Sequence, residues 1–413
     1  MRDAPDAIQA AGWRARTSIA ASIVAVLLVA GAGAGCSPRK PPLTIGISLS
    51  LTGDLADPGA AAKRGYELWA DTANANGGVL SRTVSLKIID DSSQPERAAA
   101  NYEKLIVSDK VDIVMGPFSS KLTIPSSQVA AKHGYAFVEP AGGAPTVFEQ
   151  RLNNLFFVQP APAVQQGAVF GQYILSLPAG KRPKTAAYTV LDDPYSAPLA
   201  AFVREMFEKA GIETVFAHTY PQDTDLLPIM RKLASTHPDV LVAATQNEDG
   251  YASVNSLVRL HWAPSWLYLA NGANSPVNFP AKVGPANVEG IFTSGDWFPS
   301  TSASGNSTFV NEYLQKYGGQ PDEIDNTSVE AYSAGLLLEQ VAAKTGRIDN
   351  ATIIEALHQG TWRTPVGDLS WNAYGSPKGS FILFQWIDGK LQSVYPSGWA
   401  QRAAITARLP WTG

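Results

Sequence analysis

Short apolar runs, often rich in β-branched residues, alternate along the chain with longer stretches of helical composition. In the part that follows residue 42, the runs predict strands and the stretches between them predict helices. The predicted strands cover residues 43–49, 84–89, 111–115 and 135–138, and the predicted helices cover 59–75, 95–108 and 122–133. Because short apolar strands between helices are typical of a parallel sheet covered on both faces, this part predicts one Rossmann-like lobe.

The same alternation begins again after residue 158 and predicts a second lobe. Its predicted strands cover 185–191, 214–217, 240–244 and 266–270, and its predicted helices cover 164–177, 197–210, 226–235 and 251–260. A further strand, three helices and two short strands follow at 290–294, 308–317, 329–344, 351–359, 369–371 and 380–386. The predicted fold class is therefore α/β, with two Rossmann-like lobes built on parallel sheets.

The N-terminal segment has the pattern of an export signal. Three arginines precede an apolar run of 14 residues, 19–32, and small residues then lead to Cys36. A membrane span needs about 20 residues, whereas the apolar region of a signal peptide needs roughly 7–15. We therefore predict a signal peptide over 1–35, lipidation of Cys36 and a proline-rich tether over 36–42. The alternative is ordinary signal cleavage, which would leave a free protein.

Composition and motifs exclude several classes of protein. The chain has 413 residues and a net charge of −4, so no basic excess neutralises nucleic-acid phosphates. With one cysteine it can form no intramolecular disulfide, and its five histidines show no metal-binding spacing. The sequence contains no P-loop, no G-x-G-x-x-G after a strand and no G-x-S-x-G elbow. We therefore expect no enzyme, no metal, no cofactor and no nucleic-acid partner.

Two segments could contact a small ligand. Ser119 and Ser120 end a Gly-Pro-Phe-Ser-Ser segment between a predicted strand and a predicted helix, where hydroxyls and backbone N–H groups can hold an anion. The alternative is plain helix capping. Gly142 and Gly143 follow the next predicted strand, where glycine lets a ligand approach the backbone or simply forms a turn.

Six motifs, in this order along the chain, carry a family resemblance. They lie at residues 45–59, 75–79, 90–95, 114–120, 192–195 and 384–390. With them the chain resembles the leucine/isoleucine/valine-binding group of periplasmic solute-binding proteins. The resemblance implies a hinged type I fold whose lobes are joined by three crossovers, near Gln159, Ser294 and Val366. It implies an N-terminal lobe of 43–158 plus 295–365, a C-terminal lobe of 159–294 plus 366–400, and a tail over 401–413.

The same resemblance implies a function in transport. Such a protein binds a small solute between its lobes and passes it to the permease and ATPase subunits of an ABC importer. We therefore expect an extracytoplasmic monomer, anchored to the bacterial cell membrane by its lipid, that binds a solute of the branched-chain amino acid class. A ligand sensor or receptor of the same fold is the alternative.

The resemblance also assigns ligand residues. Ser120, with Ser119 beside it, matches the hydroxyl that holds an amino acid's carboxylate, and Gly142 and Gly143 fall near the carboxylate and ammonium. The other two matches are Tyr195, a cleft tyrosine of the second lobe, and Asn271, which falls where the family has the acid that pairs with the ammonium.

An asparagine cannot supply a negative charge, and a buried ammonium without a carboxylate is strongly disfavoured. Either another acid replaces the usual one, with Glu139, Glu248 and Asp249 as candidates, or the ligand lacks an α-ammonium. An amide, a urea-like solute or an aromatic acid would fit the second case. Trp297 and Phe298 could then wall an aromatic ligand, or they could belong to the core.

Overall fold

The computed structural model describes residues 40–405 and residue 411. The predicted signal peptide and Cys36 lie outside the described residues. Within the described ranges, no helix is long and apolar enough to pass through a membrane.

The first lobe is built on a sheet of five parallel strands in the order β2-β1-β3-β4-β5. These strands are β1 (Leu43–Leu49), β2 (Val84–Asp90), β3 (Ile113–Met115), β4 (Phe137–Glu139) and β5 (Leu155–Phe157). Alternate residues of a strand point to opposite faces of its sheet. In β3, Ile113 and Met115 accordingly join one core cluster, whereas Val114 between them joins another. The continuous apolar runs of the sequence thus reflect a sheet that is buried on both faces.

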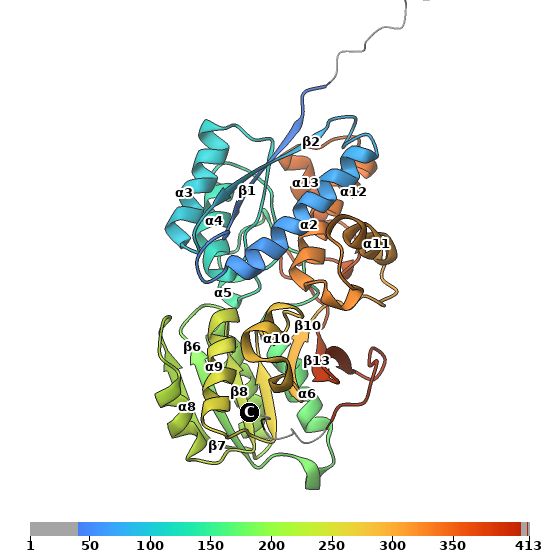
Figure 1. Cartoon of the computed structure of the whole chain (residues 1–413). Coiled ribbons are helices and arrows are strands. Elements are labelled where there is room, and N and C mark those ends of the chain that lie inside the picture. The colour runs from blue at the N-terminus through green and yellow to red at the C-terminus, as the bar shows by residue number, and fades with distance from the viewer. Residues whose placement is uncertain (1–39, 406–410, 412–413) are drawn as a thin grey trace, which may run out of the picture. The chain divides into compact units, whose positions relative to one another are not determined.

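In the described part of the chain, seven α-helices pack around this sheet. They are α2 (Ala56–Ala75), α3 (Pro95–Glu103), α4 (Ser120–Lys132), α5 (Pro145–Glu149), α11 (Asn306–Tyr317), α12 (Asn326–Thr345) and α13 (Asn350–Leu357). Helices α2 and α12 lie side by side although they are far apart in sequence (Figure 1). Their close approach needs Gly335, because a Cβ there would lie 2.0 Å from the ring of the buried Trp69.

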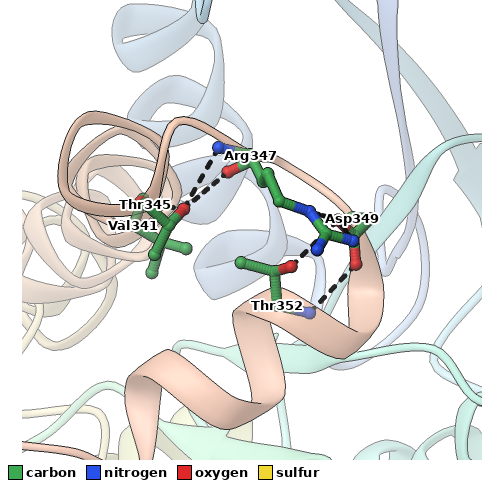
Figure 2. A network of polar contacts seen from close by, with 5 residues as sticks. All are labelled: Val341, Thr345, Arg347, Asp349 and Thr352. Atoms are coloured by element: carbon green, nitrogen blue, oxygen red, sulfur yellow. Dashed lines mark hydrogen bonds and ion pairs between the residues drawn. The ribbon is translucent and has the colours of Figure 1, made fainter.

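A polar network joins the last two of these helices (Figure 2). Thr345 Oγ1 donates to the carbonyl of Val341 at 2.8 Å, near the end of α12. Asp349 then caps α13, since its Oδ1 accepts from the backbone N–H of Thr352 at 3.0 Å. The Arg347 guanidinium contacts the other oxygen of Asp349 at 2.9 Å. The Asp349 bond satisfies a backbone N–H that the start of α13 leaves unpaired.

The second lobe is built on seven strands in the order β14-β13-β10-β9-β8-β6-β7. Its strands are β6 (Thr185–Leu191), β7 (Glu213–Tyr220), β8 (Val240–Ala244), β9 (Trp266–Leu269), β10 (Ile291–Gly295), β13 (Ile382–Ile387) and β14 (Lys390–Tyr395). The five strands from β10 to β7 pair in parallel, so the predicted two-lobed α/β fold with parallel sheets is confirmed. The last two strands add an antiparallel edge, which short apolar runs alone do not reveal.

Helices cover both faces of this sheet as well. One face carries α6 (Val164–Ser176) and α7 (Ser196–Lys209). The other carries α8 (Leu227–Ala234), α9 (Asn247–Arg259) and α10 (Asn278–Val283).

Core packing near the end of the chain bears on the position of the third crossover. After the hairpin of β11 (Trp362–Thr364) and β12 (Gly367–Leu369), Trp371 still packs in the core of the first lobe. Its indole donates to the carbonyl of Phe157 at 2.7 Å. Phe381 is the next residue in the core of the second lobe. We therefore propose that the third crossover lies between Trp371 and Phe381 rather than near Val366, because side chains of the hairpin pack in the core of the first lobe.

Candidate functional site

A cavity lies between the two lobes, beside the segments that connect them. The first lobe contributes residues from the ends of β3 and β4, and the second lobe contributes residues from the ends of β6, β8 and β9. In parallel sheets of this kind, ligands bind outside the carboxyl ends of the strands. The cavity volume open to the centres of water-sized molecules is about 40 Å³. One water needs about 10–15 Å³ by this measure, so the cavity has room for a compact solute.

Ser119 and Ser120 lie in this cavity but act differently. Ser119 immediately precedes α4 in an extended conformation, and its hydroxyl makes no capping bond to the helix. Although Ser119 is only 4% exposed, its Oγ has no hydrogen-bond partner among the described residues. Ser120 Oγ instead accepts from the backbone N–H of Ala144 at 3.0 Å. Ser119 thus presents a hydroxyl to the cavity at the positive end of α4, whereas Ser120 fixes the turn opposite.

The glycine turn after β4 is shaped by packing within the first lobe. Gly143 lines the cavity, and a Cβ there would lie 2.7 Å from the ring of Phe157. Gly142 does not line the cavity, and a Cβ there would lie 2.7 Å from Glu139 Oε1. Both glycines are therefore needed for close approach, and only Gly143 faces the space between the lobes.

Glu139 supports this turn from inside the lobe. Its side chain is fully buried, and Oε2 accepts from the backbone N–H of Ala141 at 2.8 Å. Burial raises the pKa of Glu139 well above its usual value. Because Glu139 is not among the residues that line the cavity, it is poorly placed to pair with a ligand's ammonium.

The wall from the second lobe is a network of hydroxyl and amide side chains, which is backed by the carboxyl group of Asp193. Tyr195, which precedes α7, donates its hydroxyl to Gln166 Oε1. Asn271, after β9, donates to Gln246 Oε1 at 3.2 Å, and Gln246 in turn donates to Asp193 at 2.8 Å. Tyr195 and Asn271 both line the cavity, and the side chain of Asn271 is an amide bonded to the amide of Gln246.

Glu248 lies in a neighbouring pocket of about 410 Å³, together with Asp249. Its side chain is 50% exposed and lies 3.8 Å from the Lys282 ammonium. Asp249 accepts a bond from Tyr220 and caps α9 through Gln246. The structure therefore does not bring either acid into the cavity that Ser119 lines.

Two acids that the sequence analysis missed do line the cavity. Asp296 follows β10 at the second crossover, and Glu330 lies one turn into α12. They are 7% and 4% exposed, and Asp296 Oδ2 and Glu330 Oε2 have no hydrogen-bond partner within the described ranges. Burial raises the pKa of Asp296 to about 7, and burial together with the charge of Asp296 raises that of Glu330. The signal that could have found Glu330 is its position among small and apolar residues in the first half of α12.

The aromatic residues next to Asp296 belong to the core. Trp297 packs in the core of the first lobe, and its indole donates to Asn306 Oδ1 at 2.6 Å. Phe298 packs against Phe384. Neither lines the cavity. Its aromatic wall comes from other parts of the chain, namely Phe118, Phe157, Tyr195 and Phe381. For metals, the described part of the chain has no group of three or more histidine, cysteine or acidic side chains that could hold an ion.

Side chains also bridge the two lobes around the cavity. Lys121 Nζ donates to Gln222 Oε1 at 3.1 Å, and Ser275 Oγ donates to Asp325 Oδ2 at 3.1 Å. Tyr251 OH approaches Asp57 at 3.4 Å. These contacts join residues of the two lobes, so polar side chains of both lobes meet around the cavity.

Comparisons with known proteins agree with this architecture. The family model described as periplasmic binding protein matches residues 42–390. A Leu/Ile/Val-binding protein homolog 3 of Brucella melitensis is 27% identical, over 84% of this chain and 92% of its own length. The branched-chain amino acid transporter substrate binding protein LivJ from Streptococcus pneumoniae, solved with isoleucine, has a TM-score of 0.76 at 19% identity and covers 86% of this chain and 100% of its own. A solute binding protein of an R. palustris ABC transporter, solved with benzoate, has a TM-score of 0.75 at 22% identity. The match covers 89% of this chain and 100% of that protein's chain.

Proposed function

Since the chain belongs to the periplasmic binding protein family, whose members bind solutes for transporters, we propose that it delivers a small carboxylate-bearing solute of the amino-acid class to an ABC importer. The observation that carries this proposal is the buried Ser119 hydroxyl, which lies at the cavity between the lobes, at the N-terminus of α4, without a partner among the described residues. A buried polar group is normally hydrogen-bonded. A ligand carboxylate would supply the missing acceptor and would also interact with the helix dipole.

Two further features support an anionic group at this position. The two solved structures named above hold isoleucine and benzoate, and both molecules carry a carboxylate. In this chain, Gly143 leaves the backbone open beside Ser119, and Tyr195 and Asn271 close the opposite wall. A neutral amide or a urea-like solute would leave the positive end of α4 without a charge partner, so the site favours a carboxylate over either of them.

The test is isothermal calorimetry of the mature protein against a panel. The panel contains branched-chain and other amino acids, benzoate and dihydroxybenzoates, simple amides, and urea. We expect the amino acids to contain the tightest ligand, with one solute bound per chain and no chemical change of the solute. Tight binding confined to urea or simple amides, or turnover of any bound solute, would refute the proposal.

We also propose that Cys36 is lipidated and holds the mature protein at the outer face of a bacterial cell membrane. Small residues before the lone cysteine support this placement, and a permease with its ATPase would be the partners. A Cys36→Ser variant should move from the membrane fraction to the soluble extracytoplasmic fraction, and mass spectrometry should find acyl chains only on the parent protein. An unmodified Cys36 in the parent protein would favour ordinary signal cleavage.

A further inference from the structure

The feature that the proposed function leaves unexplained is the pair of acids at the hinge side of the cavity. Asp296 and Glu330 come from different segments, the second crossover and helix α12. Each is more than nine-tenths buried, and each has one carboxyl oxygen without a hydrogen-bond partner in the part of the chain that the structure describes. The other oxygen of Asp296 accepts from Asn326 Nδ2 at 3.0 Å.

Asp296 and Glu330 both line the cavity and are close enough to interact electrostatically, since the charge of Asp296 raises the pKa of Glu330 after burial, the larger cause. Two adjacent buried carboxyls cannot both ionise without a counter-charge. The pair therefore holds a proton when no cation is near.

No basic side chain is placed to neutralise the pair. Among the described residues that line the cavity, there is no lysine, arginine or histidine. The other groups that act electrostatically on Glu330 add negative charge, since they are the carboxyls of Asp325 and Glu139. Arg64 acts on Asp325, where it opposes the effect of burial on the pKa. The remaining ionisable groups nearby are the phenols of Tyr66 and Tyr195, whose raised pKa values reflect burial first and Glu330 among other neighbours.

We propose that Asp296 and Glu330 form the counter-ion site for a cationic nitrogen of the solute, so that the solute is a compact zwitterion whose ammonium faces the hinge. This inference rests on the proposed function, which places the carboxylate end at Ser119. It also answers the question raised by Asn271, because the negative charge absent at the end of β9 is supplied by Asp296, which follows β10. Of the ligands considered above, an amino acid fits this site. An aromatic acid without an ammonium would leave Asp296 and Glu330 without a positive counter-charge.

Binding by this route exchanges a proton for the ligand cation. When the pair is fully protonated, one proton leaves a carboxyl for the solvent as the ammonium arrives, and the bound pair carries a single negative charge. Affinity for a zwitterion should therefore rise by up to tenfold per pH unit below about pH 7 and level off above it. An amino acid keeps both its charges between pH 5 and 8. The pH dependence of its affinity therefore reports the titration of groups on the protein.

The experiment uses calorimetry at pH 5, 6, 7 and 8 in buffers of different ionisation enthalpy, which counts released protons. The probe is L-leucine, or the amino acid that binds most tightly in the panel above, with the analogue that has hydrogen in place of the ammonium (4-methylpentanoate for leucine). We expect the analogue to bind roughly 10- to 150-fold more weakly at pH 7, the range for losing a hydrogen bond to a charged group. Asp296→Asn and Glu330→Gln should weaken the amino acid similarly and flatten its pH dependence, with little effect on the analogue.

The matched control is Glu205→Gln, which removes one negative charge from the exposed face of α7. It should leave the affinity and its pH dependence unchanged. Equal binding of amino acid and analogue, or a pH dependence that survives in both hinge variants, would overturn the inference while leaving the proposed function intact. If no amino acid in the panel binds, the proposed function falls and this inference falls with it.

Discussion

Replacing Ser119 with alanine should separate ligand binding from stability. Serine at the position before a helix usually caps it, and its replacement by alanine then costs about 0.5–2 kcal/mol of stability. Ser119 makes no such capping bond, and its buried hydroxyl has no partner among the described residues. We therefore expect the free energy of unfolding of Ser119→Ala to stay within about 0.5 kcal/mol of the parent value, or to rise slightly as an unsatisfied group is removed.

Ligand affinity should respond in the opposite way. A hydrogen bond to a charged group contributes about 1.5–3 kcal/mol, and each 1.4 kcal/mol is about tenfold in affinity. Ser119→Ala should thus weaken the tightest amino acid of the panel by about 10- to 150-fold. Calorimetry measures this affinity, and urea unfolding without ligand measures stability.

Ser120→Ala is the matched comparison. It removes the acceptor of the buried Ala144 N–H and should cost about 1–3 kcal/mol of stability. If Ser119→Ala instead lost as much stability as Ser120→Ala while affinity stayed within about twofold, Ser119 would be a structural residue and the reasoning would be wrong.

Three further predictions concern the lobes and the hinge. Gly335→Ala should destabilise the first lobe by about 1–3 kcal/mol in urea unfolding, because the new methyl would lie 2.0 Å from the ring of Trp69. The free protein should lose stability as the pH rises from about 5 to 7, because the pKa values of Asp296 and Glu330 are raised on folding and the folded state holds the extra protons. Thermal melts of the double variant Asp296→Asn/Glu330→Gln should show a weaker dependence of stability on pH. Asp349→Ala should cost about 0.5–2 kcal/mol through loss of the cap of α13, measured by urea unfolding.

Controls are available for each of these. Gly180→Ala adds a methyl where nothing lies within 4 Å, so it should change stability little, and an equal loss at both glycines would contradict the packing argument. Asp349→Asn keeps a capping oxygen and should retain most of the stability that Asp349→Ala loses. For the pH dependence, stability that is flat between pH 5 and 7 in the parent protein would contradict the assignment of raised pKa values.

Local patterns were enough to predict most of the fold. The alternation of short apolar strands with helices predicted both lobes, because period-two burial and helical composition are local properties of the chain. The same patterns missed the antiparallel edge at β13 and β14, since direction depends on which strand a segment pairs with. They also could not assign the β11–β12 hairpin to a lobe, because an apolar run such as that ending in Trp371 fits either core equally well.

The sequence likewise predicted only part of the candidate site. Ser119, Ser120, Gly143, Tyr195 and Asn271 all lie just beyond strand ends, where a parallel sheet gathers its ligand-facing residues, so sequence reasoning could name them. Glu248 also follows a strand, but the structure places it in the neighbouring pocket, because its helix turns the side chain toward Lys282.

The chain's own residues determined the order of its elements and the strand ends where a solute could bind. Tertiary structure alone decided which hydroxyl is left unpaired at α4, and it alone brought Asp296 beside Glu330. The physical reason is that burial and pairing of charges depend on distances between segments far apart in sequence. Those distances are set only when helix α12 packs across the first lobe and the chain crosses back at β10.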